Sequence, residues 1–331
     1  MLLLSTLQQF DIELPFFLLS LAAAGMLLIW TLGAFCSPVV AVKTEFFYSI
    51  RRKAFYDKCA LHIAQSGLLL FFVSALVLGG LLSLFFMHQD AVTPNVPVPP
   101  VQLAWRIGAF TAPLAACFLL FLIYRATWKP LKKVRALHML LGILTALLCM
   151  ATLFTGLLVV ASLRQPLLFP LLWTNTVRLL QVLVLDFLAS PFLWITLAYL
   201  YCLGVTSATG FAQFWLIARR NKDDYGRDYY AFAMRYCAGI AALFALLCTA
   251  LIGLFFWELH SSVPAELRQP EDPAIMLVAY GLPLLSCLLW FCAAKSATPM
   301  RHKPGVVFAF LFLFLGLCAQ MIMLVNAYPL M

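Results

Sequence analysis

The chain has 331 residues and a formal net charge of +9, and 64% of its residues are apolar while 11% are charged. A soluble domain of this size cannot bury that much apolar surface, so the composition excludes a soluble globular protein and indicates that the bilayer is the solvent. The positive charge is not spread like that of a nucleic-acid-binding surface, because 18 of the 22 Lys and Arg residues fall in four short segments between apolar runs. We therefore expect membrane lipid, and no nucleic acid, as the partner of these basic segments.

Apolar runs of about 20 residues recur along the chain, and a helix of that length crosses about 30 Å of hydrocarbon. We predict an all-α membrane protein, a single transmembrane domain over 1–331, with eight transmembrane helices in four hairpins and one interfacial helix. The predicted spans are 15–37, 60–86, 104–124, 137–162, 191–218, 231–257, 274–295 and 305–327, and they form hairpins over about 15–86, 104–162, 191–257 and 274–327.

Proline and polar residues mark the ends of these spans. Pro15 opens the first span, where a missing N–H costs nothing, and Ser37-Pro38 predicts its end. The segment 167–189 is too polar for a crossing and predicts a helix lying on the outer membrane surface. Pro191 follows a serine and predicts the first residue of the fifth span.

The four basic segments predict the orientation in the membrane. They cover 43–58, 125–135, 219–235 and 295–303, and the other four Lys and Arg residues lie in the alternate loops. Because Lys and Arg are enriched on the cytoplasmic side, we expect these segments inside and both termini outside. Residues 1–15 lack the charged start and the small-residue cleavage site of a signal peptide. We predict a multi-pass protein of the bacterial inner membrane.

Several chemical motifs are missing from the sequence. The ten cysteines form no C-x-x-C pair, so they suggest no iron–sulfur, zinc or covalently attached haem site, and we expect buried thiols. No Asp, Glu, Lys or Arg lies clearly in the middle of a predicted span, unlike the proton relays and ion-coupled carriers that need one. The H-E-x-x-H, G-x-S-x-G and Walker A motifs are also absent.

Three spans share one spacing: a large polar group near the start, a small residue four positions later and a glycine eighteen positions later. The members are His62, Ser66 and Gly80; His138, Gly142 and Gly156; and Arg235, Gly239 and Gly253. Eighteen residues make about five helical turns, so the three positions of each set share one helix face. We expect the three later glycines to face other helices, where small residues allow close approach.

The two histidines are the candidate metal ligands. His62 and His138 begin parallel spans at the same register, so we expect them at equal depth, where they could hold the iron of a b-type haem from opposite sides. Arg235 could pair with the haem propionates or with a quinone oxygen. Met234 could replace one histidine, and Trp128 and the tyrosines of the basic loops could line the same level. The alternative is that the histidines and Arg235 only extend to the interface and that the small residues only pack helices.

Two hairpins resemble a known family. The first, LPFFLLSLAAAGMLLIW…RRKAFYDKCALHIAQSG, is similar to the opening hairpin of the cytochrome bd quinol oxidase large subunit. The third, FLWITLAYLYCLGVTSATGFAQFWLIARRNKDDYGRDYYAFAMRYCAG, resembles the hairpin that carries a haem-ligand histidine in that family. The resemblance covers about a third of the chain and implies a shared bundle architecture and a redox setting.

The sequence also departs from that family. The first span has no histidine, Trp194 stands near the place of the low-spin haem ligand, and the G-R-Q-P-W motif is absent. The loop over 258–273 is short for the family's quinol-binding loop. The resemblance therefore implies no oxygen reduction, and it assigns no haem ligand in this chain.

These observations predict two functions. The first is a membrane subunit of a respiratory electron-transfer complex, which passes electrons between quinol and a partner protein through a b-type haem held by His62 and His138. As an enzyme it would be a quinol-linked oxidoreductase subunit that does not reduce oxygen. The alternative is a non-catalytic membrane anchor subunit, or a carrier of a neutral or apolar solute.

Overall fold

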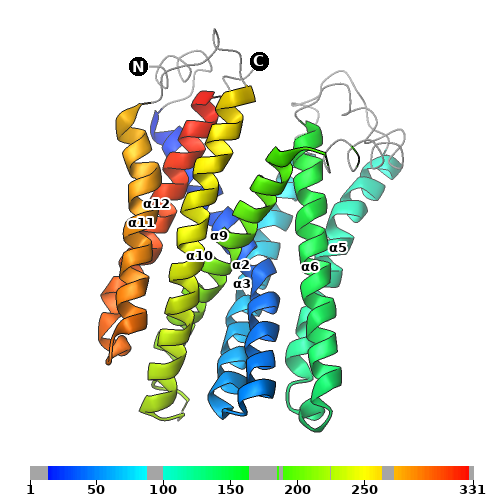
Figure 1. The fold of residues 1–331 in the computed structure, drawn as a ribbon. Coiled ribbons are helices and arrows are strands. Elements are labelled where there is room, and N and C mark those ends of the chain that lie inside the picture. The colour runs from blue at the N-terminus through cyan, green and yellow to red at the C-terminus, as the bar shows by residue number, and fades with distance from the viewer. Residues whose placement is uncertain are drawn as a thin grey trace.

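The computed structural model describes residues 14–87, 100–163, 185, 189–223, 225–262 and 272–327, and these ranges contain helices and no strand. The long helices of this part are α2 (Leu14–Arg51), α3 (Ala54–Met87), α5 (Pro100–Ala126), α6 (Arg135–Leu163), α9 (Pro191–Arg219), α10 (Arg227–Ser262), α11 (Pro273–Lys295) and α12 (Lys303–Ala327), shown in Figure 1. Seven of them are long and apolar enough to cross a membrane, and α5 adds a shorter apolar helix over Thr111–Ala126. The predicted all-α membrane class is confirmed.

Consecutive helices are joined in pairs at one end of the molecule, which we call the basic end (Figure 1). The α2–α3 turn is made by Arg52 and Lys53, with Arg52 at φ 54°. The short 3₁₀ helices η1 (Pro130–Lys133) and η3 (Pro299–His302) join α5 to α6 and α11 to α12. The four basic segments of the sequence therefore come together at this end.

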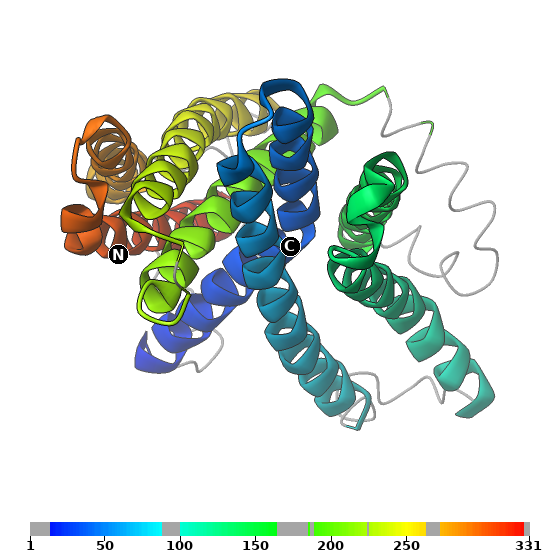
Figure 2. The same cartoon turned by 90° about the horizontal axis from the view of Figure 1, so that it is seen from below.

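Helix α2 lies at the centre of the bundle. It packs against α3, α9, α6 and α12, so α5 and α6 lie on one side of the α2–α3 pair and α9 to α12 on the other (Figure 2). Residues 32–38 of α2 are all buried, although Thr31 and Val39 beside them are only partly so. Burial on every side of this segment makes α2 the element that joins the two halves.

The predicted end of the first span at Pro38 is wrong, because α2 continues through Pro38 to Arg51. A proline inside a helix removes one backbone hydrogen bond. Here the neighbouring Ser37 hydroxyl donates to the Gly33 carbonyl at 2.6 Å, and burial of the surrounding residues favours a continuous helix. Helix α3 correspondingly begins at Ala54 and not at 60. The predicted start of α9 at Pro191 is confirmed, and the predicted interfacial helix over 167–189 lies outside the described residues except for 185 and 189.

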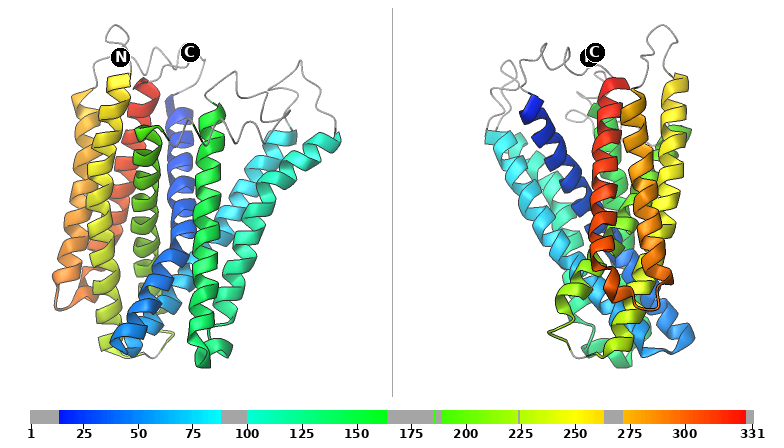
Figure 3. Two further views of the ribbon diagram at one scale, coloured as in Figure 1. Left: turned by 45° about the vertical axis from the view of Figure 1, so that its right-hand side comes forward. Right: turned by 90° about the vertical axis from the view of Figure 1, so that its left-hand side faces the viewer.

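The predicted packing of the three later glycines is wrong. A Cβ atom added at Gly80, Gly156 or Gly253 would meet nothing within 4 Å. The outer half of α3 leans away from the bundle (Figures 2 and 3), which leaves Gly80 exposed. Close packing occurs instead two turns from the start of α6: a Cβ on Gly142 would lie 2.5 Å from Val42 Cγ2 and 2.7 Å from Tyr124 Cε2.

Two glycines of α6 therefore make a matched pair for substitution. Gly142→Ala should lower the free energy of unfolding in detergent by about 1–3 kcal/mol, because overpacking must displace α2 or Tyr124. Gly156→Ala should leave it unchanged or raise it by up to about 1 kcal/mol, through better helix propensity without a clash. Equal losses from both variants would contradict the packing of α6 on α2 and α5.

Candidate functional site

Two groups of polar side chains lie at the basic end, each around one of the predicted histidines. The first, the Glu45 cluster, comprises Glu45, Asp57, Tyr124, Arg135 and His138. The second, the His62 cluster, comprises His62, Arg219, Asp223 and Tyr229. Glu45, His62 and His138 are only 1%, 2% and 3% exposed. Burial of an ionisable group is costly unless it is paired, so the partners of these residues decide what they can do.

The Glu45–His138 pair is the centre of the first cluster. Glu45 lies in the part of α2 beyond Pro38, and His138 lies one turn into α6. His138 Nδ1 is 2.9 Å from Glu45 Oε1 and 3.1 Å from Oε2, and its Nε2 is 3.0 Å from the Tyr124 carbonyl oxygen. A carbonyl oxygen only accepts, so Nε2 carries a proton and donates. Nδ1 and the Glu45 carboxyl then share a second proton, either as an imidazolium–carboxylate pair or as a carboxylic acid donating to a neutral ring.

Three further groups complete the Glu45 cluster. The Tyr124 hydroxyl donates to Glu45 Oε2 at 3.0 Å, and Arg135 Nε lies 3.5 Å from Glu45 Oε1. The Arg135 guanidinium also pairs with the Asp57 carboxylate of α3 and lies 3.8 Å from the centre of the Tyr48 ring. Aromatic rings shield the histidine: Tyr124 stacks on it and Trp128 meets it edge-on, both with ring centres 4.7 Å away. The cluster thus connects α2, α3, α5 and α6.

The His62 cluster joins α3 to the connection between α9 and α10. Tyr229 is fully buried and its hydroxyl lies 2.6 Å from His62 Nδ1, while His62 Nε2 lies 3.5 Å from Asp223 Oδ2. The carboxylate accepts, so the proton of a neutral ring belongs on Nε2, and the Tyr229 hydroxyl donates to Nδ1. Asp223 also lies 3.6 Å from Arg219 Nε. The histidine is therefore held from both sides by protein groups.

The structure does not bring His62, His138 and Arg235 together. The two histidines contact different residues, and both ring nitrogens of each face protein partners. A haem ligand needs one ring nitrogen directed at iron and a gap wide enough for the macrocycle, so the residues present do not fit a haem held by both histidines. Arg235 is exposed on α10 and donates from Nε to the Ala231 carbonyl, and Met234 is buried in the core.

Glu45 is the site residue that sequence reasoning missed. It falls in the basic segment 43–58 that the sequence predicts between two spans, because Ser37-Pro38 predicts the end of the first span. A helical pattern continues after that proline: Ala41, Thr44, Glu45 and Tyr48 follow the spacing i, i+3, i+4 and i+7 of one helix face. That signal predicts a longer helix with a carboxylate on its buried side.

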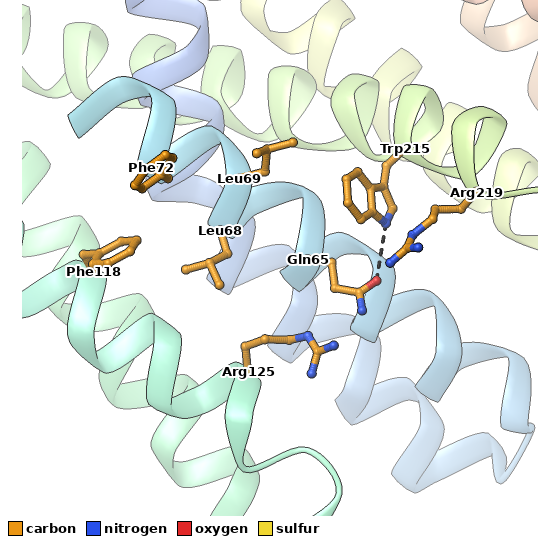
Figure 4. A pocket seen from close by; sticks show the side chains of 8 residues that line it. All are labelled: Gln65, Leu68, Leu69, Phe72, Phe118, Arg125, Trp215 and Arg219. Carbon is orange, nitrogen blue, oxygen red and sulfur yellow. Dashed lines mark hydrogen bonds between the residues drawn. The ribbon is translucent and has the colours of Figure 1, made fainter. Parts of the chain in front are cut away.

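A third feature is a groove of about 400 Å³ between α3, α5 and α9 (Figure 4). It is lined by Gln65, Leu68, Leu69, Phe72, Phe118, Arg125, Trp215 and Arg219. Trp215 Nε1 donates to Gln65 Oε1 at 3.3 Å across the groove. Arg219 belongs both to this lining and to the His62 cluster, so the two features are adjacent.

Within the described residues, no three His, Cys, Asp or Glu side chains are grouped closely enough to hold a metal ion. Comparisons of the chain with protein-family models, with curated proteins and with solved structures found no match. The roles of the clusters and of the groove are therefore inferred from their own geometry.

Removing one member of the Glu45–His138 pair should be strongly destabilising. Glu45→Ala and His138→Ala should each lower the free energy of unfolding in detergent by about 3–5 kcal/mol, the usual loss when a buried ionic partner is left alone. The double variant should lose at least about 1 kcal/mol less than the sum of the two, because the residues contact each other. Lys132 is exposed in η1, so Lys132→Ala is the control and should leave the free energy of unfolding nearly unchanged. Additive losses would show that the two side chains do not interact.

Proposed function

We propose that this chain is an integral membrane anchor subunit of a respiratory electron-transfer complex, in which His62 and His138 hold helices together and bind no haem between them. The observation that supports this is the engagement of both ring nitrogens of each histidine by separate sets of protein groups. The anchor holds its partner subunits at the membrane, and the electron carriers belong to those partners.

The two clusters suit such a role because they specify which helices pair. Lipid tails are as apolar as the helices, so burial of apolar surface does not by itself select one helix neighbour over another in a membrane. A buried polar or charged group that must find its partners on another helix does select. The Glu45 cluster selects the contact of α6 with α2, and the His62 cluster selects the contact of α3 with the start of α10.

The proposed topology has eight crossings in four hairpins, with α5 as the third crossing and the segment 167–189 as the interfacial helix. The basic end faces the cytoplasm of a bacterial inner membrane and both termini lie outside. The arrangement of the four basic connections at one end supports this orientation, because Lys and Arg are enriched on the cytoplasmic side.

The respiratory setting is supported by the resemblance of the first and third hairpins to the cytochrome bd large subunit. Electron transfer through a haem between His62 and His138 would require both clusters to open. A carrier of a neutral solute would require a cavity across the whole membrane, whereas the groove between α3, α5 and α9 runs from Arg125 and Arg219 at the basic end as far as Phe72 and Phe118. The anchor function requires neither the opening of the two clusters nor a cavity across the membrane.

Optical spectra of the isolated chain and the composition of its complex test this proposal. The purified chain should show no Soret band in a reduced-minus-oxidised spectrum. An affinity tag on the chain should retain partner subunits from solubilised membranes. A Soret band that disappears in His62→Ala or in His138→Ala would contradict the structural role of the histidines. The absence of any retained partner would contradict the anchor function.

The orientation is tested separately by reporter fusions. A reporter joined at Asn95 should be active outside the cytoplasm, and one joined at Asp223 should be active inside, because an odd number of proposed crossings separates them. Activity of both on the same side would contradict the proposed set of crossings.

A further inference from the structure

The groove between α3, α5 and α9 has one apolar part and one cationic part. On α3, Gln65, Leu68, Leu69 and Phe72 follow the helical spacing i, i+3, i+4 and i+7, so one face of this helix forms a wall. Leu69 and Phe72 lie in the membrane-spanning part of α3, and each is 50% exposed. This wall therefore presents apolar surface to a molecule in the hydrocarbon layer.

The cationic part lies at the basic end of the groove. Arg125 is in the last turn of α5 and Arg219 is in the last turn of α9. Figure 4 shows the two guanidinium groups on either side of Gln65. Two guanidinium groups that converge on one space form a site for an anion with several oxygens, such as a phosphate.

The two cations are not fully compensated by the protein. Arg219 has Asp223 at 3.6 Å and Trp215 beneath it, yet its Nε is buried without a hydrogen-bond partner. No carboxylate of the described ranges forms an ion pair with Arg125. Among the described residues, Arg219 therefore has one acidic partner and Arg125 has none, which leaves the groove with an excess positive charge.

The polar and apolar ends of the groove are arranged like the headgroup and the upper acyl chain of a lipid at the membrane interface. Gln65 and Phe72 are seven residues apart on α3, as are Phe118 and Arg125 on α5, which places the apolar wall about 10 Å along the helix axis from the polar end. Trp215 lies beside the cations, at the level where tryptophan is enriched in membrane proteins. A headgroup at the arginines would direct an acyl chain along Leu68, Phe72 and Phe118.

We propose that this groove binds one anionic phospholipid, with its phosphate between Arg125 and Arg219 and an acyl chain against the apolar wall of α3 and α5. Charge complementarity selects this occupant over a zwitterionic lipid or a neutral quinone, because the groove carries uncompensated positive charge. The bound lipid fills the space between α3, α5 and α9 and neutralises the positive charge of the two arginines.

The test uses the full chain, delipidated in detergent, with phosphatidylglycerol as the probe. Phosphatidylglycerol should raise the thermal unfolding temperature and should be retained as one lipid per chain in native mass spectrometry, whereas phosphatidylcholine should do neither. Arg125→Gln should weaken phosphatidylglycerol binding about tenfold, since one charge-assisted contact is lost. Arg125→Lys should recover part of that loss, because it restores the charge without the planar fork.

Lys133→Gln is the matched control, because it removes one exposed cation of the same basic end outside the groove. Lys133→Gln should leave phosphatidylglycerol binding unchanged. Arg125→Gln and Lys133→Gln should both elute from a size-exclusion column like the parent chain, which shows that they are folded. Equal binding of phosphatidylcholine would overturn the proposal, as would equal weakening by the two Gln variants. Stabilisation by inorganic phosphate alone would show a site for a small anion, and stabilisation by ubiquinone that survives Arg125→Gln would show a quinone site. Neither result depends on whether the chain is an anchor subunit.

Discussion

The contact between Glu45 and His138 is the interaction on which the arrangement of the helices depends. A carboxyl group that is 1% exposed must either be paired or be neutral. Here both of its oxygens lie within 3.1 Å of one imidazole nitrogen, with the Tyr124 hydroxyl and Arg135 alongside. This pairing fixes the rotation of α6 about its axis, because any other rotation would leave Glu45 without its main partner.

The continuity of α2 follows from the same constraint. The turns beyond Pro38 carry Thr44 and Glu45, which are both buried. Thr44 reaches the Tyr236 hydroxyl of α10 at 3.1 Å, while Glu45 reaches α5 and α6. Were α2 to end at the proline, these contacts would be lost, and α2 would be held to α5, α6 and α10 by apolar packing, which selects helix partners weakly in a membrane.

Arg219 couples the second cluster to the groove. It lies near Asp223, which in turn faces His62, and its other side lines the space that we assign to a phospholipid phosphate. An anion in the groove would share the positive charge that Asp223 now balances alone. The proposed lipid binding would therefore be linked to the position of the α9–α10 connection through one side chain, and such a linkage acts in both directions.

The amino-acid sequence determined the class of this protein, because long apolar runs and segregated basic residues are properties of composition along the chain. It also placed most helix starts within a few residues and picked out His62 and His138 as candidate site residues. It could not say what those histidines contact, since Glu45 and His138 are 93 positions apart and hydropathy does not report how each helix is rotated.

The tertiary structure decided that His62 and His138 face different partners, that Pro38 lies inside a helix, and that Gly142 is packed while Gly156 is exposed. Neighbour choice in a membrane depends on a few polar contacts and on steric fit between helices, and both exist only once the helices are assembled.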